Sequence, residues 1–111
     1  MNEELFPTMT TVVHCRQAPF DVYIGRPSKW GNPFSHLGES TAPVYVRTRD
    51  DAIKCYEEWI YGGQRAIHAR LQLERPTIEE IKQELRGKRL GCWCKPFPCH
   101  GDVLARIAEG A

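Results

Sequence analysis

The last third of the chain alternates between helical and extended patterns, and this alternation constrains the fold more than any other feature. Thr77 and Glu80 stand at capping-box spacing before apolar residues at helical intervals, and Gly87 ends the pattern, which predicts a helix over 77–86. The following residues predict a strand over 88–94 and a helix over 102–109. This order is typical of a parallel α/β layer, so we expect an α/β fold: a small three-layer Rossmann-like domain with a mainly parallel sheet.

The rest of the chain supplies further elements for the same domain. β-Branched residues and helical spacing of apolar residues, with Thr48 as an N-cap, predict strands at 10–15, 21–25 and 44–46 and helices at 49–60 and 64–74. The prolines within 26–37 exclude a long helix or a central strand, so this segment is expected to be a structured loop. We expect a single α/β domain over 10–111, preceded by an N-terminal tail at 1–9.

Composition limits the classes of protein to consider. The chain has 111 residues, a net charge of +1 and five cysteines. No apolar run reaches the roughly 20 residues that a membrane helix needs, and the N-terminus lacks a signal-peptide pattern, so we expect no membrane association and a cytoplasmic location. In that compartment cysteines serve as thiols or metal ligands, and an odd number cannot all form disulfides.

Three of the cysteines lie between positions 92 and 99, next to a histidine. On a regular strand Cys92 and Cys94 face the same way roughly 6–7 Å apart, which strains a shared metal ion, so Cys92 is interpreted as a core residue. The residues better suited to zinc are Cys94, Cys99 and His100, with His14 or Cys15 as a fourth ligand. Zinc is therefore a candidate cofactor.

Cys99 and Gly101 stand at the expected start of the last helix, where unpaired backbone N–H groups favour negative charge. Near Lys95, the pKa of the Cys99 thiol is expected to be lowered, which makes Cys99 a candidate nucleophile. The same place suits a phosphate, because Gly101 lets the backbone approach closely. Asp102 would act as a base or simply cap the helix.

The loop at 26–37 combines basic and aromatic side chains. Arg26 and Lys29 are suited to phosphate, and Asn32 to a base edge or sugar. Trp30 and Phe34 would either stack on a base or form a small core under the loop. Basic residues beside aromatics are typical of a site for a phosphorylated ligand, and equally of an ordinary solvated surface.

Four motifs together carry a family resemblance. They are the runs 24–26, 29–34 and 85–88, the last leading into 92–94, and the run 99–102. In this combination the chain resembles the domain of unknown function 4326 family, found largely in phages and bacteria. The cysteine–histidine segment is also similar to a motif of the domain of unknown function 488 family. Both families look similar to small Rossmann-like folds that handle nucleotides. Where the family tends to have an asparagine this chain has His14, whereas Arg16 fits its place.

The sequence thus predicts a nucleotide- or nucleic-acid-processing protein that binds a phosphorylated ligand between loops 25–36 and 94–102. The expected ligand-binding residues are Arg16, Gly25, Arg26, Lys29, Trp30, Asn32, Phe34, Lys95 and Gly101. Cys99, His100 and Asp102 would carry out transfer or hydrolysis at a glycosidic or phosphate bond. The alternative is a non-enzymatic, zinc-stapled module that binds nucleic acid or protein. A thiol redox protein is less favoured, because the chain has no Cys-x-x-Cys motif.

Overall fold

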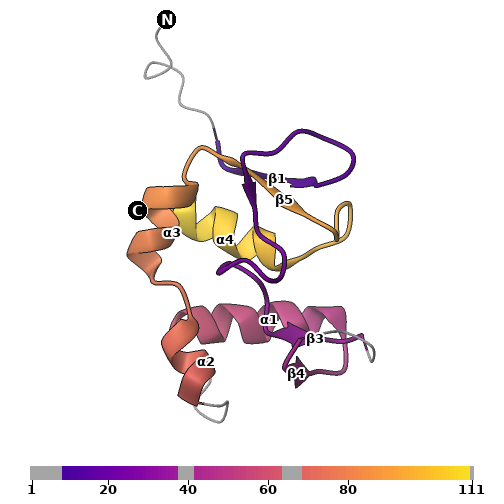
Figure 1. Ribbon diagram of the computed structural model, residues 1–111, viewed down its shortest axis with the longest axis vertical. Helices are drawn as coiled ribbons and strands as arrows, with labels where there is room; N and C mark the ends of the chain where they lie inside the picture. The colour runs from indigo at the N-terminus through magenta and orange to yellow at the C-terminus, as the bar shows by residue number, and fades with distance from the viewer. Residues whose placement is uncertain (1–8, 38–41, 64–68, 111) are drawn as a thin grey trace, which may run out of the picture.

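The computed structural model describes residues 9–37, 42–63 and 69–110 of the chain, and Figure 1 shows how its elements are arranged. The expected tail at 1–9 and the first half of the helix expected at 64–74 lie almost entirely outside these residues. In chain order the elements are β1 (Thr11–His14), β2 (Val22–Tyr23), β3 (Phe34–Ser35), β4 (Val44–Tyr45), α1 (Arg49–Ile60), α2 (Ala69–Glu74), α3 (Ile78–Leu85), β5 (Arg89–Cys92) and α4 (His100–Glu109).

The main sheet is parallel and has β5 at its centre. Its strand order is β1-β5-β2, with Thr11 aligned with Arg89 on one side of β5 and Val22 aligned with Leu90 on the other. The mixed α/β class and the parallel pairing are therefore as expected from the sequence.

A second, two-stranded sheet pairs β3 with β4, also in parallel. The sequence interpretation was wrong at Phe34 and Ser35, because they form a strand inside the segment expected to be a loop. The pairing partner, Val44–Tyr45, lies where a short strand was expected. The sheet packs against α1, and both its β3 residues are buried.

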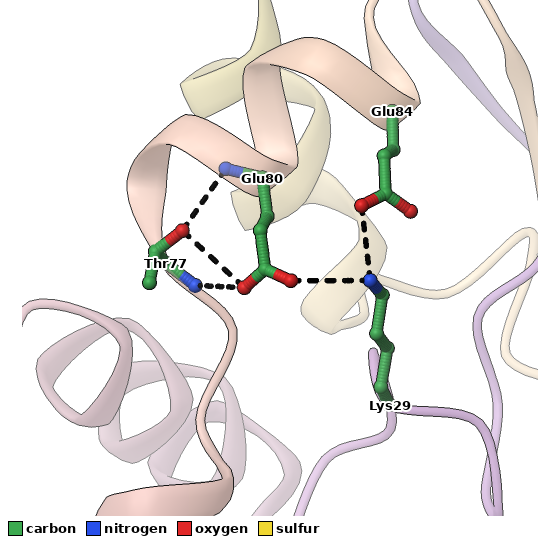
Figure 2. Close-up of polar contacts among 4 residues, drawn as sticks. All are labelled: Lys29, Thr77, Glu80 and Glu84. Carbon is green, nitrogen blue, oxygen red and sulfur yellow. Dashed lines mark hydrogen bonds and ion pairs between the residues drawn. The ribbon is translucent and has the colours of Figure 1, made fainter.

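The caps of α1 and α3 agree with the sequence. Thr48 is the N-cap of α1 and accepts a hydrogen bond from the backbone N–H of Asp51. Thr77 and Glu80 form a complete capping box at the start of α3, shown in Figure 2. Gly87 has a φ of 78°, the left-handed conformation that glycine adopts after a helix end.

Helix α4 begins two residues earlier than the sequence indicated. Its N-cap is Cys99, whose sulfur accepts the backbone N–H of Gly101, and the Asp102 carboxylate accepts the backbone N–H of Cys99. Asp102 therefore completes a capping box as its third helical residue and is not itself the N-cap. The sequence missed this start because cysteine is not among the usual N-cap residues.

Helix α4 connects the main sheet with helices α1 and α3. It contacts β1 and β5 of the main sheet, α3 beside it, and α1 on its far side, and it lies between the main sheet and α1 in Figure 1. Its apolar face, with Val103, Leu104 and Ile107, is buried in a core shared with α1 and α3. These contacts do not confirm the finer expectation of a three-layer Rossmann-like domain. Within the described ranges, none of the helices is both long and apolar enough to cross a membrane.

Candidate functional site

A cavity of about 390 Å³ opens where β2 and β5 end, beside the start of α4. Its walls come from the segment after β2, from one side of α1, and from the segment that joins β5 to α4. The lining residues are Gly25, Arg26, Asn32, Phe34, Ser35, His36, Leu37, Arg49, Ala52, Ile53, Cys92, Trp93, Cys94, Phe97, Pro98, Cys99 and His100.

The cavity brings together about half of the residues that the sequence proposed for the site. Those that line it are Gly25, Arg26, Asn32, Phe34, Cys94, Cys99 and His100. Those that do not are Arg16, Lys29, Trp30, Lys95, Gly101 and Asp102. Arg16 lies over the ring of Trp93 at the cavity, 5.7 Å from its centre, and the other five residues are explained by contacts elsewhere in the fold.

Lys29 and Trp30 are directed away from the cavity. The Lys29 ammonium bonds to Glu80 at 3.2 Å and Glu84 at 3.0 Å, which ties the loop to α3 (Figure 2). The pKa of Lys29 is raised, first by its hydrogen bond to Glu84. Trp30 is only 4% exposed and belongs to the core, with its carbonyl accepting the Tyr56 hydroxyl at 2.7 Å. For Trp30 the structure therefore supports the core alternative over base stacking.

Asn32 lines the cavity but uses both ends of its amide to fix the loop. Its nitrogen donates to the Ala52 carbonyl of α1 at 3.1 Å, and its oxygen accepts the backbone N–H of Phe34 at 2.8 Å. The backbone carbonyl of Asn32 accepts a hydrogen bond from the Arg26 guanidinium at 2.6 Å. Asn32 thus anchors the loop on α1 and holds Arg26 at the cavity wall.

Around the α4 start, the residues expected to hold phosphate are used in packing and capping. The Lys95 ammonium pairs with the Asp102 carboxylate at 2.9 Å. Gly101 is buried, and a β-carbon there would lie 2.7 Å from Ile24 Cδ1 and 2.9 Å from Val12 Cγ1. The absence of a β-carbon at Gly101 therefore allows α4 to pack closely on the sheet.

The cysteines form one cluster, although strand geometry had separated Cys92 from the other two. The sulfurs of Cys92 and Cys99 are 3.2 Å apart, and the thiol of Cys94 influences the pKa of both. Cys92 is buried, as expected, but the segment 93–98 folds back and brings Cys99 to it.

Hydrogen bonding distributes the acidity of this cluster unevenly. The thiols of Cys94 and Cys99, and after them the backbone N–H groups of Cys94 and Lys95, hold the pKa of Cys92 well below its usual value. The pKa of Cys99 is raised by its hydrogen bonds to Cys92 and Cys94 and by burial. The expectation of a lowered pKa for Cys99 was therefore wrong, and Cys92 is the sulfur best suited to carry a negative charge.

His100 is a neutral imidazole in the cavity wall. Its Nε2 lies 2.8 Å from the Ile24 carbonyl oxygen, and its ring meets Tyr56 edge-on. Because a carbonyl only accepts hydrogen bonds, Nε2 carries the proton and Nδ1 keeps a lone pair. Burial lowers the pKa of His100, so the neutral form is favoured.

The set expected for zinc is not arranged for it. His100 is engaged with the Ile24 carbonyl, and His14 Nδ1 accepts the backbone N–H of Arg16 at 3.1 Å. In the ranges that the structure describes, no group of three or more histidine, cysteine, aspartate or glutamate side chains is positioned to hold a metal ion.

The sequence missed five residues that line the cavity with polar or aromatic side chains: Ser35, His36, Arg49, Trp93 and Phe97. Arg49 is the first residue of α1, and its guanidinium lies 5.1 Å from the centre of the Phe97 ring. No sequence pattern had marked His36 or Trp93 as part of the site. Arg49 could have been identified from its place directly after the Thr48 N-cap, because the N-cap fixes where the first side chain of the helix points.

Comparisons with known proteins place the chain in a family. It is 34% identical over 98 residues to an uncharacterized 12.4 kDa protein of the nrdA–td intergenic region of Enterobacteria phage T4, covering 88% of this chain and 76% of that protein. No solved structure matches it. The resemblance to the domain of unknown function 488 family is not confirmed. A family described as "Domain of unknown function (DUF4326)" matches residues 10–110, and the chain belongs to it.

Proposed function

We propose that the cavity binds a nucleotide or a nucleic-acid end and that the protein processes it. The observation that carries this proposal is the pair of arginines, Arg26 and Arg49, on the wall of a mainly apolar cavity. Guanidinium groups bind phosphate with charge-assisted hydrogen bonds, and apolar walls suit a base.

The place and size of the cavity support the same ligand. Ligand pockets span roughly 300–1,000 Å³, and this cavity measures about 390 Å³. In open parallel sheets ligands bind outside the carboxyl ends of the strands, and the cavity is lined there by Gly25 after β2 and Cys92 at the end of β5. This location is also the main support for keeping a Rossmann-like relationship as part of the proposal.

The chemistry we propose is transfer or hydrolysis at a glycosidic or phosphate bond. His100 would act as a general base through the Nδ1 lone pair, because burial keeps its ring neutral. Among the thiols, Cys92 is the better nucleophile, with Cys99 stabilising its charge through the 3.2 Å sulfur contact. Asp102 would act as a positioning residue, since it holds the backbone N–H of Cys99.

Isothermal titration calorimetry with nucleoside monophosphates, and with the same nucleosides lacking phosphate, tests the proposal. Arg49→Ala should weaken binding of the monophosphates by roughly tenfold or more, as expected for the loss of a charge-assisted hydrogen bond of about 1.5–3 kcal/mol. The nucleosides should lose much less. Arg106→Ala, which removes an arginine paired with Glu57 on another face, is the charge-matched control. Equal effects of the two substitutions, or no binding by the unmodified protein, would rule the proposal out.

The alternative function is a zinc-stapled binding module. The observation in its favour is the 3.2 Å contact between the sulfurs of Cys92 and Cys99, because thiolates suit a soft metal; further described side chains would have to move to complete a set of ligands. Elemental analysis of the purified protein distinguishes the two functions: about one zinc per chain, with unfolding by a chelator, would favour the module. Under either function we keep a cytoplasmic location as a proposal, since free thiols persist in a reducing compartment.

A further inference from the structure

Two exposed aromatic side chains stand at the mouth of the cavity. Trp93 is 54% exposed and Phe97 is 59% exposed, and both line the cavity. Each has an arginine over its ring: Arg16 lies 5.7 Å from the ring centre of Trp93, and Arg49 lies 5.1 Å from that of Phe97. Exposed apolar side chains that gather in one patch mark an interaction site, whereas singly scattered ones do not.

The aromatic surface continues away from the cavity. The Trp93 indole N–H donates to the Tyr23 hydroxyl at 2.9 Å, and the ring of Tyr23 lies 6.3 Å from that of Phe20. Phe20 is itself 39% exposed. We call these four residues, Phe20, Tyr23, Trp93 and Phe97, the aromatic rim.

Strand alternation explains why most of the rim lies outside the core. Cys92 points toward Cys99 at the start of α4, so its neighbours Gly91 and Trp93 point away from that helix. A β-carbon on Gly91 would lie 2.7 Å from Cγ of Phe20, which shows that the Phe20 ring rests directly on this side of β5. The rim therefore extends from the cavity mouth along the face of the sheet opposite α4.

From these observations we infer that the rim binds a single strand of nucleic acid whose terminal nucleotide enters the cavity. The inference rests on the proposed function and names its substrate class. Single strands bind where successive bases stack on aromatic side chains and the phosphates meet basic groups. Trp93 and Phe97 each offer a ring on which a base can stack, and each has an arginine beside the ring that can contact a phosphate.

The charges along the rim fit a polyanion. Arg16 and Arg49 lie over its rings, 5.7 Å from the ring centre of Trp93 and 5.1 Å from that of Phe97. Asp21, which follows Phe20 in the chain, has its charge countered by Arg89 at 3.5 Å. A protein partner would cover the same rings but has no need of arginines above them, so we commit to nucleic acid.

The test compares an oligonucleotide with a mononucleotide on the same variants. Fluorescence anisotropy with an eight-nucleotide single strand should give an affinity at least tenfold above that for the matching mononucleotide measured by calorimetry. Arg16→Ala, outside the cavity and the core, should weaken only the oligonucleotide. It should also reduce the slope of log affinity against log salt by about 0.7, the value for one phosphate contact on a single strand. Deoxyribose and ribose strands of one sequence distinguish DNA from RNA.

Phe20→Ala provides a second variant. It should weaken the oligonucleotide by roughly fivefold to a hundredfold, the range for one lost stacking contact, and leave the mononucleotide unchanged. Circular dichroism checks its folding, because Phe20 rests on β5, and Arg106→Ala is the control for charge. If mononucleotides bind through Arg49 but the oligonucleotide binds no more tightly, the inference fails and the proposed function stands. If the oligonucleotide binds tightly and neither rim variant changes it, the strand lies elsewhere and the inference fails. If neither ligand binds, both proposals fail.

Discussion

Replacing Gly101 with alanine tests whether this glycine serves packing or ligand binding. It is the second residue of α4 and is buried. The added methyl group would lie 2.7 Å from Ile24 Cδ1, 2.9 Å from Val12 Cγ1 and 3.2 Å from Cys99 Sγ. These distances are well below the 3.5–4.0 Å at which carbon atoms attract one another.

Two opposing effects set the size of the change. Alanine is favoured over glycine in a helix interior by about 1 kcal/mol, and less in the first turn. Overpacking a core costs about 1–3 kcal/mol, and here the neighbours have little freedom, because Ile24 is fully buried and Val12 is stiff at χ1. Overpacking therefore wins, and we expect Gly101→Ala to lower the free energy of unfolding by about 1–2 kcal/mol. For a domain of this size the melting temperature should fall by roughly 5–10 °C.

Urea and thermal unfolding followed by circular dichroism measure this change. Ala105→Gly, at a half-buried position of the same helix, reports helix propensity alone and should cost up to about 1 kcal/mol. A Gly101→Ala protein as stable as the unmodified chain, or more stable, would refute the packing argument. Such a protein with weakened nucleotide binding would restore the phosphate role.

Two further predictions concern Lys29 and His100. Lys29→Ala should leave nucleotide affinity within about twofold by calorimetry, because its ammonium bonds to Glu80 and Glu84 on α3 and not to the cavity; a tenfold loss would contradict this. Because burial lowers the folded-state pKa of His100, the unfolded state takes up a proton first as the pH falls below about 6.5, and stability drops. The free energy of unfolding falls by up to about 1.4 kcal/mol per pH unit, and it stops falling once the pH is below the folded-state pKa of His100. Urea unfolding from pH 7 to pH 5 should show it in the unmodified protein and not in His100→Gln; identical slopes would contradict it.

Local signals in the sequence predicted the helices well. The N-caps at Thr48 and Thr77 and the left-handed glycine at 87 depend on residues within one turn, so their meaning does not require the rest of the fold. The start of α4 was misplaced because the capping thiol of Cys99 is unusual. Strand β3 was missed because its two residues are specified by pairing with β4, not by their own pattern.

The candidate site was located by segment more accurately than by residue. The basic and aromatic composition of 25–36 and 94–102 identified two of the walls. Which side chains enter the cavity depends on distant partners, such as α3 for Lys29 and Tyr56 for Trp30. The contact between Cys92 and Cys99 depends on how 93–98 folds back, and strand spacing alone could not give it.

The central position of β5 has a consequence for how the protein folds. Both early strands, β1 and β2, are neighbours of β5 in the sheet, so neither has its partner until almost the whole chain is available. Forming such pairs requires closing long loops. The conformational entropy lost in closure precedes the strand contacts that offset it, which slows folding. The cavity needs β5 and α4 for one of its walls, so it is completed only when this last segment docks. Gain of the proposed nucleotide binding during refolding would therefore report the docking of this last segment and not an early step.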